Sequence, residues 1–224
     1  MRVIFNEELK QVADDLDRMA QDVRKAINGA SEALLKQDVE AAQTVIDGDI
    51  EIDALESSII DQCVRLLAKQ NPVATDLRVV VSTLRLASTF ERMGDLARHV
   101  AEGARRTYPA SPLPEEAQPV FAEMLDFLSD TADQLIAMLS DRDAKTAEHI
   151  ILNDDKLDEL HHKTFELALS DNITRQQTVD IVLLGRFLER LGDHAVSAAR
   201  RVVYIVSGFD PSKKPARDEE GAIE

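Results

Sequence analysis

The phrase ERMGDLARHV at residues 91–100 has a close copy, ERLGDHAVSA, at residues 189–198. Both copies lie in segments whose apolar residues recur every three or four positions, a spacing typical of long amphipathic helices. Residues four apart lie on the same face of a helix, so Glu91 and Asp95 form an acidic pair, which the second copy repeats. Such a pair destabilises an isolated helix by about 0.2 to 0.5 kcal/mol. Because both halves of the chain keep it, we expect a positive group, most simply a cation, to lie over each pair.

The same apolar spacing extends over most of the chain and predicts helices throughout. The predicted helices cover about residues 5–36, 38–69, 72–106, 116–140, 144–169 and 175–207. Asp38 and Thr174 are suitable N-caps, and Gly208 is a suitable glycine at a helix C-terminus. No segment has the period of a strand, so the predicted fold class is all-α.

The two phrases also divide the chain into domains. They stand 98 positions apart, a period that is too long for a solenoid and suits a duplicated three-helix domain. Between them, YPASPLP at residues 108–114 holds three prolines, which no helix interior accepts. We therefore predict two tandem, pseudo-symmetric three-helix bundles, made of six long helices in total. The predicted boundaries are residues 1–107 for the first bundle, 108–115 for the linker, 116–208 for the second bundle and 209–224 for a disordered tail.

Composition excludes several classes of function. The chain has 224 residues and a net charge of -16, which argues against a nucleic-acid binder that neutralises phosphates. Cys63 is the only cysteine, so a disulfide within the chain and a cysteine-based zinc site are not expected. We expect neither a signal peptide nor a transmembrane segment, because no apolar run is long enough. The predicted location is the cytoplasm, including a peripheral place at the inner face of the membrane through partners.

The acidic pairs are the candidate metal ligands. Two further pairs with the same spacing lie on the preceding helix of each half, and antiparallel packing would bring four carboxylates together in each half. Close carboxylates without an equal number of interleaved Lys or Arg do not all stay ionised cheaply, and a divalent metal resolves the conflict. Oxygen ligands alone favour Mg, Ca or Mn, whereas an imidazole from His99, His161 or His162 would admit Fe or Zn. The candidate ligands are Asp49, Asp53, Glu91, Asp95, Asp154, Asp158, Glu189 and Asp193.

The competing interpretation is an ordinary solvated acidic surface, since this spacing is common in a chain that is 30% charged. Gly94 and Gly192 favour a specific packing or ligand-binding site over an ordinary surface. Each costs about 1 kcal/mol in a helix interior relative to Ala, which is understandable if another helix or a ligand approaches there. Arg92 and Arg190 are interpreted as surface ion-pair partners rather than anion receptors.

No catalytic motif accompanies the acids, and Cys63 is interpreted as a core residue with no general base. We therefore predict a protein that is not an enzyme. The alternative is a carboxylate-bridged di-metal enzyme or a metal-storage protein in the style of ferritin-like bundles.

Three stretches resemble the PhoU family of bacterial phosphate-uptake regulators: AKQNPVATDLR at residues 68–78, the two ERxGD phrases, and VYIVSG at residues 203–208. The likeness covers about residues 1–208. It implies two pseudo-symmetric three-helix bundles, with Fe, Zn, Mn or Mg sites on the eight acids named above. It also implies a negative regulator of the phosphate-starvation response that acts as an adaptor between the ATPase subunit of a phosphate ABC transporter and a sensor histidine kinase.

Two departures from the internal repeat matter. The QNPVATDLR phrase has no close copy in the second half, so the halves are expected to differ in partner binding. The segment after Gly208 holds no motif that we can assign. Long amphipathic helices in a repeated design often expose apolar stripes, from which we expect a homodimer.

Overall fold

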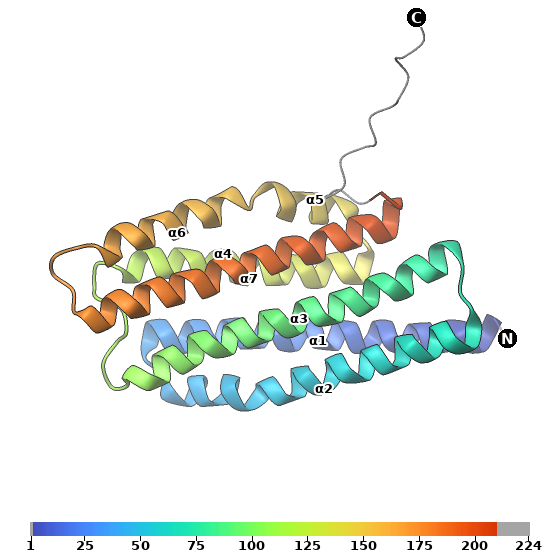
Figure 1. Ribbon diagram of the computed structural model, residues 1–224, viewed down its shortest axis with the longest axis horizontal. Coiled ribbons are helices and arrows are strands. Elements are labelled where there is room, and N and C mark those ends of the chain that lie inside the picture. Colours follow the sequence, from blue (N-terminus) through green and yellow to red (C-terminus); the bar gives the residue numbers. More distant parts are fainter. Residues whose placement is uncertain (1, 210–224) are drawn as a thin grey trace, which may run out of the picture.

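The computed structural model describes residues 2–209 of the chain. All regular structure in these residues is helical (Figure 1), which confirms the predicted all-α fold. The helices are α1 (Arg2–Lys36), α2 (Val39–Gln70), α3 (Ala74–Thr107), α4 (Gln118–Asp141), α5 (Ala144–Leu152), α6 (Asp155–Ala168) and α7 (Arg175–Ser207). Apart from Phe209, the predicted disordered tail lies outside the described residues.

The predicted caps are present. The side chain of Asp38 accepts hydrogen bonds of 3.0 Å from the backbone N–H groups of Glu40 and Ala41, which begins α2. Thr174 and Gln177 form a reciprocal capping box at the start of α7. Gly208 ends α7 with a φ of 75°, a left-handed conformation that glycine adopts without a steric penalty.

The fifth predicted helix is divided into α5 and α6. At the break, Asn153 Nδ2 donates a hydrogen bond of 2.7 Å to the backbone carbonyl oxygen of His149. An asparagine side chain that bonds nearby backbone competes with the helical hydrogen bonds and so favours a turn. The same position in the first half holds Gly48, where α2 continues without interruption. Asp154 consequently lies at the start of a new helix rather than inside a long one.

The helices pack as two bundles side by side. Figure 1 shows α1, α2 and α3 as one antiparallel bundle, with α4, α5, α6 and α7 beside it. The two bundles meet along their length, because α3 packs against α7 and α1 packs against α4. Within each bundle, the two helices that carry the acidic pairs are direct neighbours: α2 lies against α3, and α6 lies against α7.

Gly94 and Gly192 let those neighbouring helices approach closely. A Cβ atom added to Gly94 would lie 2.9 Å from Cδ1 of Ile52 on α2, and one added to Gly192 would collide with Leu157 on α6. Ile52 and Leu157 occupy corresponding positions of the two halves, and both are buried. The glycines are therefore explained by helix packing.

Polar contacts join the halves as well as apolar ones. Arg106 on α3 forms an ion pair with Asp180 on α7, whose side chain is fully buried. Asp180 also accepts a hydrogen bond of 3.0 Å from Gln176 Nε2. On the other flank, Ser129 Oγ on α4 donates a hydrogen bond of 2.8 Å to Asn28 Oδ1 on α1.

The remaining sequence expectations concern the linker, the cysteine and the membrane. Leu113 and Ala117 are buried, so the proline-rich segment packs against the bundles. Cys63 is fully buried and unbonded, and burial raises the pKa of its thiol to about 11, as expected of a core cysteine. Between residues 2 and 209, no helix is both long enough and apolar enough to cross a membrane.

Candidate functional site

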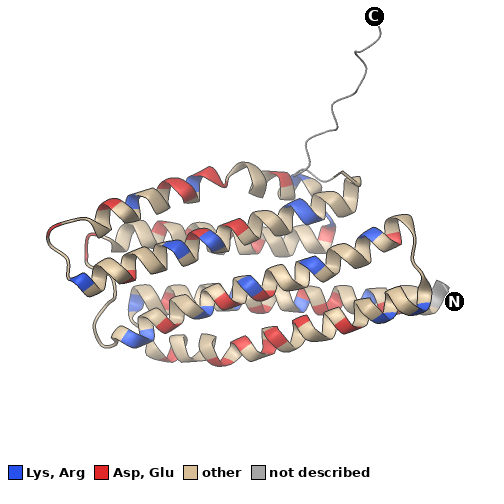
Figure 2. Cartoon of the chain, viewed as in Figure 1, with Lys and Arg blue, Asp and Glu red and all other residues tan. Residues whose placement is uncertain are grey.

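The eight predicted ligands fall into two groups on adjacent helices. We call Asp49 and Asp53 of α2 with Glu91 and Asp95 of α3 the first acidic cluster. The second acidic cluster comprises Asp154 and Asp158 at the start of α6 with Glu189 and Asp193 of α7. Figure 2 shows acidic and basic residues interspersed along the helices of both bundles.

The members of each cluster repel one another enough to affect their pKa values. Burial raises the pKa of Glu91, and the charges of Asp95, Glu56 and Asp53 raise it further, against the lowering effect of Arg92. In the second cluster, burial is again the main reason for the raised pKa of Asp154, and the charges of Asp158 and Asp193 add to it.

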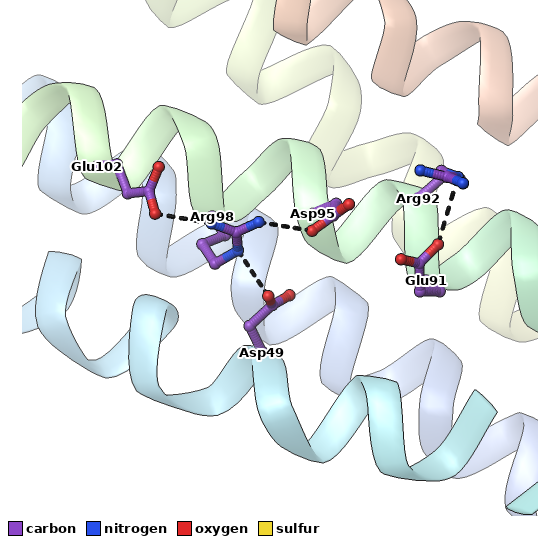
Figure 3. A network of polar contacts seen from close by, with 6 residues as sticks. All are labelled: Asp49, Glu91, Arg92, Asp95, Arg98 and Glu102. Carbon is purple, nitrogen blue, oxygen red and sulfur yellow. Dashed lines mark hydrogen bonds and ion pairs between the residues drawn. The ribbon is translucent and has the colours of Figure 1, made fainter. Parts of the chain in front are cut away.

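Arg98 lies in the first cluster and joins its two helices (Figure 3). Its Nε atom is 2.6 Å from Asp49 Oδ2 on α2, an ion pair across the helix–helix contact. Its Nη2 group donates a hydrogen bond of 2.7 Å to Asp95, and its Nη1 group donates another of 2.7 Å to Glu102. One guanidinium group therefore contacts three carboxylates.

This network affects the proton affinities of its members. Hydrogen bonds to Asp95 and Glu102 and the charge of Asp49 raise the pKa of Arg98, although burial opposes them. The pKa of Asp49 is nevertheless raised, because burial outweighs the favourable charge of Arg98. Asp49 is thus a partly desolvated carboxylate that has one strong ionic partner.

The other acids of the first half have weaker partners. Arg92 Nε lies 3.5 Å from Glu91 Oε2, and the Arg92 side chain is 63% exposed, so this pair contributes little to stability. Ser88 Oγ donates a hydrogen bond of 2.7 Å to Glu56 Oε1, one turn beyond Asp53 on α2. Arg92 is an ion-pair partner at the surface, as the sequence predicts.

The second cluster has a different set of basic residues. Arg186 Nη1 donates to both carboxylate oxygens of Glu189. The charge of Arg200 lowers the pKa of Asp154, but no ion pair between these two residues is formed within residues 2–209. The position that corresponds to Arg98 holds Val196, which is buried and carries no charge. Val196 therefore cannot join α6 to α7 as Arg98 joins α2 to α3.

The histidines also differ between the halves. His161 occupies the position that corresponds to Glu56, is 9% exposed, and its buried Nε2 atom has no hydrogen-bond partner among the described residues. Its pKa is lowered by burial first and by Arg186 and His162 next, while Asp158 and Asp193 oppose this shift. His99 instead stacks on Phe187 of α7, with ring centroids 5.2 Å apart.

His162 is exposed. His194, which the sequence analysis did not select as a ligand, is partly buried on α7. Burial, Arg190 and Arg92 lower its pKa.

The donor chemistry of both clusters suits a hard cation, since carboxylate oxygens are the ligands that Mg and Mn prefer. In the side-chain positions of residues 2–209, however, no three His, Cys, Asp or Glu groups converge closely enough to hold an ion. The eight-residue metal site remains a prediction. The structure adds Arg98, which the sequence analysis did not single out, although it lies three residues after Asp95 and four before Glu102 on one helix face.

These features define a duplicated helical-bundle protein with matched acidic clusters, and comparison with known proteins identifies its class. The PhoU domain model matches residues 16–104 and again residues 121–202, one match in each half. The chain belongs to the PhoU domain family.

Similar proteins cover nearly the whole chain. The phosphate-specific transport system accessory protein PhoU homolog 1 of Mycobacterium tuberculosis is 36% identical over 95% of this chain and 97% of that protein. The PhoU homolog of Deinococcus radiodurans is 34% identical over 93% of this chain and 99% of that protein. The crystal structure of PhoU from Pseudomonas aeruginosa has a TM-score of 0.83 and 29% identity, covering 92% of this chain and all of that one.

Proposed function

We propose that this protein is a non-enzymatic regulator of phosphate uptake that restrains the phosphate-starvation response. The supporting observation is the paired PhoU domain match, which coincides with the two bundles and their acidic clusters. Relatives named as accessory or regulatory proteins of phosphate transport support the same role. Those names, and a sequence without a recognised catalytic motif, support the proposal that the regulator is not an enzyme.

The di-metal enzyme is not favoured. An enzyme needs an open metal position inside a pocket. A groove of about 770 Å³ lies between α1 and α2, but none of the eight carboxylates lines it. The acidic clusters lie instead on the outer faces of paired helices, where Asp53, Asp158 and Asp193 are exposed.

The regulatory role is tested by deleting the gene in its own host and following a reporter driven by a phosphate-starvation promoter. Deletion is expected to switch the reporter on in phosphate-rich medium, and the wild-type gene supplied elsewhere is expected to switch it off again. A reporter that responds normally to phosphate in the deletion strain would overturn the proposal.

In this role the protein works in the cytoplasm, at the inner face of the membrane, as an adaptor between the transporter ATPase subunit and a sensor histidine kinase. Affinity capture of the tagged protein from phosphate-replete cells is expected to recover both partners. The matched control is the same capture from cells that lack the ATPase subunit. Recovery of neither partner from either culture would rule out the adaptor mechanism while leaving a regulatory role intact.

The acidic clusters are proposed to bind divalent or iron ions (Mg, Mn, Zn or Fe). Support comes from the raised pKa values of Glu91, Asp154 and Glu189, for which burial is the main cause and the charges of neighbouring carboxylates add to the rise. A bound cation would stabilise the fold by about 2.7 kcal/mol when it is present at a hundred times its Kd. The melting temperature should therefore rise with added metal and fall with a chelator, and identical melting curves would contradict metal binding.

A homodimer is the proposed oligomeric state. Exposed apolar side chains support it, including Leu152 at the end of α5 and Leu169 directly after α6, which are 79% and 84% exposed. Light scattering at micromolar concentration should give about twice the chain mass of 24.9 kDa. Monomer mass across that range would exclude a tight dimer.

A further inference from the structure

The first and second acidic clusters differ at one central position. In the first cluster, Arg98 contacts Asp49 on α2 and Asp95 on α3, so a single cation joins the two helices. The corresponding carboxylates of the second cluster are Asp154 on α6 and Asp193 on α7. They repel each other, and the place of the arginine is taken by Val196.

The difference does not reflect the number of acids. The first half carries two further acids beside its cluster, Glu56 and Glu102, whereas the corresponding residues of the second half are His161 and Arg200. Arg186 pairs with Glu189 at the edge of the second cluster. Net charge alone would therefore assign a metal ion to the first half. The contacts of Arg98 with Asp49 and Asp95, which the second cluster lacks, instead assign it to the second half.

The bridging position decides between these alternatives because Arg98 is attached to the chain. A covalently attached guanidinium group is present at every metal concentration, and it already contacts the oxygens of Asp49 and Asp95. A divalent ion that entered between them would have to displace two contacts of 2.6 and 2.7 Å and leave a charge that is three-quarters buried without those partners. Breaking such a pair is costly, because the remaining charge is left uncompensated.

Each half has a histidine nitrogen that is buried and without a hydrogen-bond partner among the described residues, but the ring of His99 in the first half stacks on Phe187 of the other bundle. In the second cluster the free donor lies on α6, the helix that carries Asp154 and Asp158. His161 Nε2 is buried and unpartnered in the described part of the chain, and the ring is within electrostatic reach of Asp158 and Asp193. Buried polar atoms without partners are uncommon and often mark the place of a water or an ion. An imidazole beside carboxylates suits Mn, Fe or Zn.

We propose that Arg98 replaces a metal ion in the first acidic cluster, so that metal binding by this chain is confined to the second cluster. This inference rests on the metal binding proposed above and states which half performs it. Asp154, Asp158 and Asp193, whose side chains do not converge on one point in residues 2–209, would have to turn toward the ion to hold it, with His161 as the nitrogen donor.

The test counts bound Mn²⁺ by the electron paramagnetic resonance signal of the free ion, on full-length protein whose folding is checked by circular dichroism. In otherwise wild-type protein, Asp154→Asn with Asp193→Asn should weaken Mn²⁺ binding by at least about 10-fold, since changing even the hydrogen-bond partners of metal ligands costs about 10- to 100-fold. Asp49→Asn with Asp95→Asn should leave the affinity and the number of bound ions unchanged.

Arg98→Val, which copies the second half, should add Mn²⁺ binding that the wild type lacks. Arg92→Val is the matched control, because Arg92 is on the same helix and pairs with Glu91 without joining α2 to α3; it should add none. Arg98→Lys keeps a cation and should also add none. If Arg98→Val does not fold, Arg98→Gln removes the charge from a side chain of similar polarity and serves the same purpose.

The outcomes separate this inference from the metal proposal on which it rests. If Asp49→Asn with Asp95→Asn releases Mn²⁺ from the wild type, metal binding holds but the inference is wrong. The inference is equally overturned if neither Arg98→Val nor Arg98→Gln binds more Mn²⁺ than the wild type. If no variant binds Mn²⁺, both ideas fail, whereas the regulatory role is judged separately by the starvation reporter.

Discussion

Asp143 and Asp154 stand at the starts of neighbouring helices, yet their pKa values shift in opposite directions. Asp143 accepts a hydrogen bond of 2.7 Å from Thr146 Oγ1 and one of 2.9 Å from the backbone of Lys145, and these contacts lower its pKa. Asp154 makes no capping hydrogen bond, and burial followed by the charges of Asp158 and Asp193 raises its pKa. The ionised form is thus stabilised by folding at Asp143 and destabilised by folding at Asp154.

Asp154→Asn should therefore stabilise the metal-free protein at pH 7, by about 0.2 to 0.5 kcal/mol for each like-charged helix pair relieved. A raised pKa means that Asp154 favours the folded state below its unfolded pKa, and that this contribution is lost as the pH rises through the folded pKa. The gain from the asparagine should accordingly disappear as the pH is lowered to the usual carboxylate range. Melting curves from pH 3 to pH 8 in the presence of a chelator measure it.

Asp143→Asn provides the control with the opposite sign. Its lowered pKa gives stability that is present above the unfolded pKa and lost as the pH falls through the folded one. The variant should be less stable than the wild type at pH 7 and equal to it in acid. Equal pH dependence for the two variants would contradict this account of the clusters.

At the scale of helices, the glycines set the distance between the acid-bearing pairs. Gly192 faces Leu157, which is 1% exposed and cannot move into solvent, whereas a Cβ atom at Gly48 would meet nothing within 4 Å. Both glycines lie within helices, so alanine improves helix propensity by a similar amount at each. The two substitutions therefore differ only in what the new methyl group touches.

Gly48→Ala should stabilise the protein by about 1 kcal/mol. The free energy of unfolding of Gly192→Ala should be lower than that of Gly48→Ala by about 1 to 3 kcal/mol, the usual cost of overpacking a buried site. Chemical denaturation of the two variants gives this difference directly. Equal stabilisation by both would show that α6 is free to move away from α7.

The helical elements were largely predictable because their causes are local: apolar spacing, proline at breaks and side-chain caps at Asp38 and Thr174. The division between α5 and α6 was missed, since the apolar spacing continues on both sides of it and the side-chain hydrogen bond of Asn153 is not visible in that spacing. The intrahelical contacts of Arg98 with Asp95 and Glu102 were readable from spacing. Its contact with Asp49 was not, because it depends on how α2 lies against α3.

On the scale of the whole molecule, the Arg106–Asp180 ion pair connects the two bundles, and its two side chains are buried to different extents. Asp180 is fully buried, and its Oδ2 atom has no hydrogen-bond partner within residues 2–209. The Arg106 side chain is 55% exposed, so water can solvate it when its partner is absent. Losing the arginine is therefore worse than losing the carboxylate charge.

Arg106→Ala should cost about 3 to 5 kcal/mol, because it leaves a buried charge uncompensated. Asp180→Asn should cost less, since Gln176 keeps a partner and Arg106 turns to solvent. Arg105→Ala is the control, as the Arg105 side chain donates an exposed hydrogen bond to Gln43 and is not paired with a buried charge in the described part of the chain. Urea unfolding of the three variants ranks them, and a larger loss for Asp180→Asn than for Arg106→Ala would contradict this reading of the pair.

Arg78, near the start of α3, donates a hydrogen bond of 3.2 Å to the backbone carbonyl of Ile205 at the end of α7, and the two residues are 127 positions apart. During translation at about 5 to 20 residues per second, roughly 6 to 25 s pass between the synthesis of one and the other. Until α7 is made, the side of α3 that finally lies against it lacks that partner. Arg78, His99 and Arg106 all lie on that side, so part of the surface that waits for α7 is polar and can be solvated in the unfinished chain.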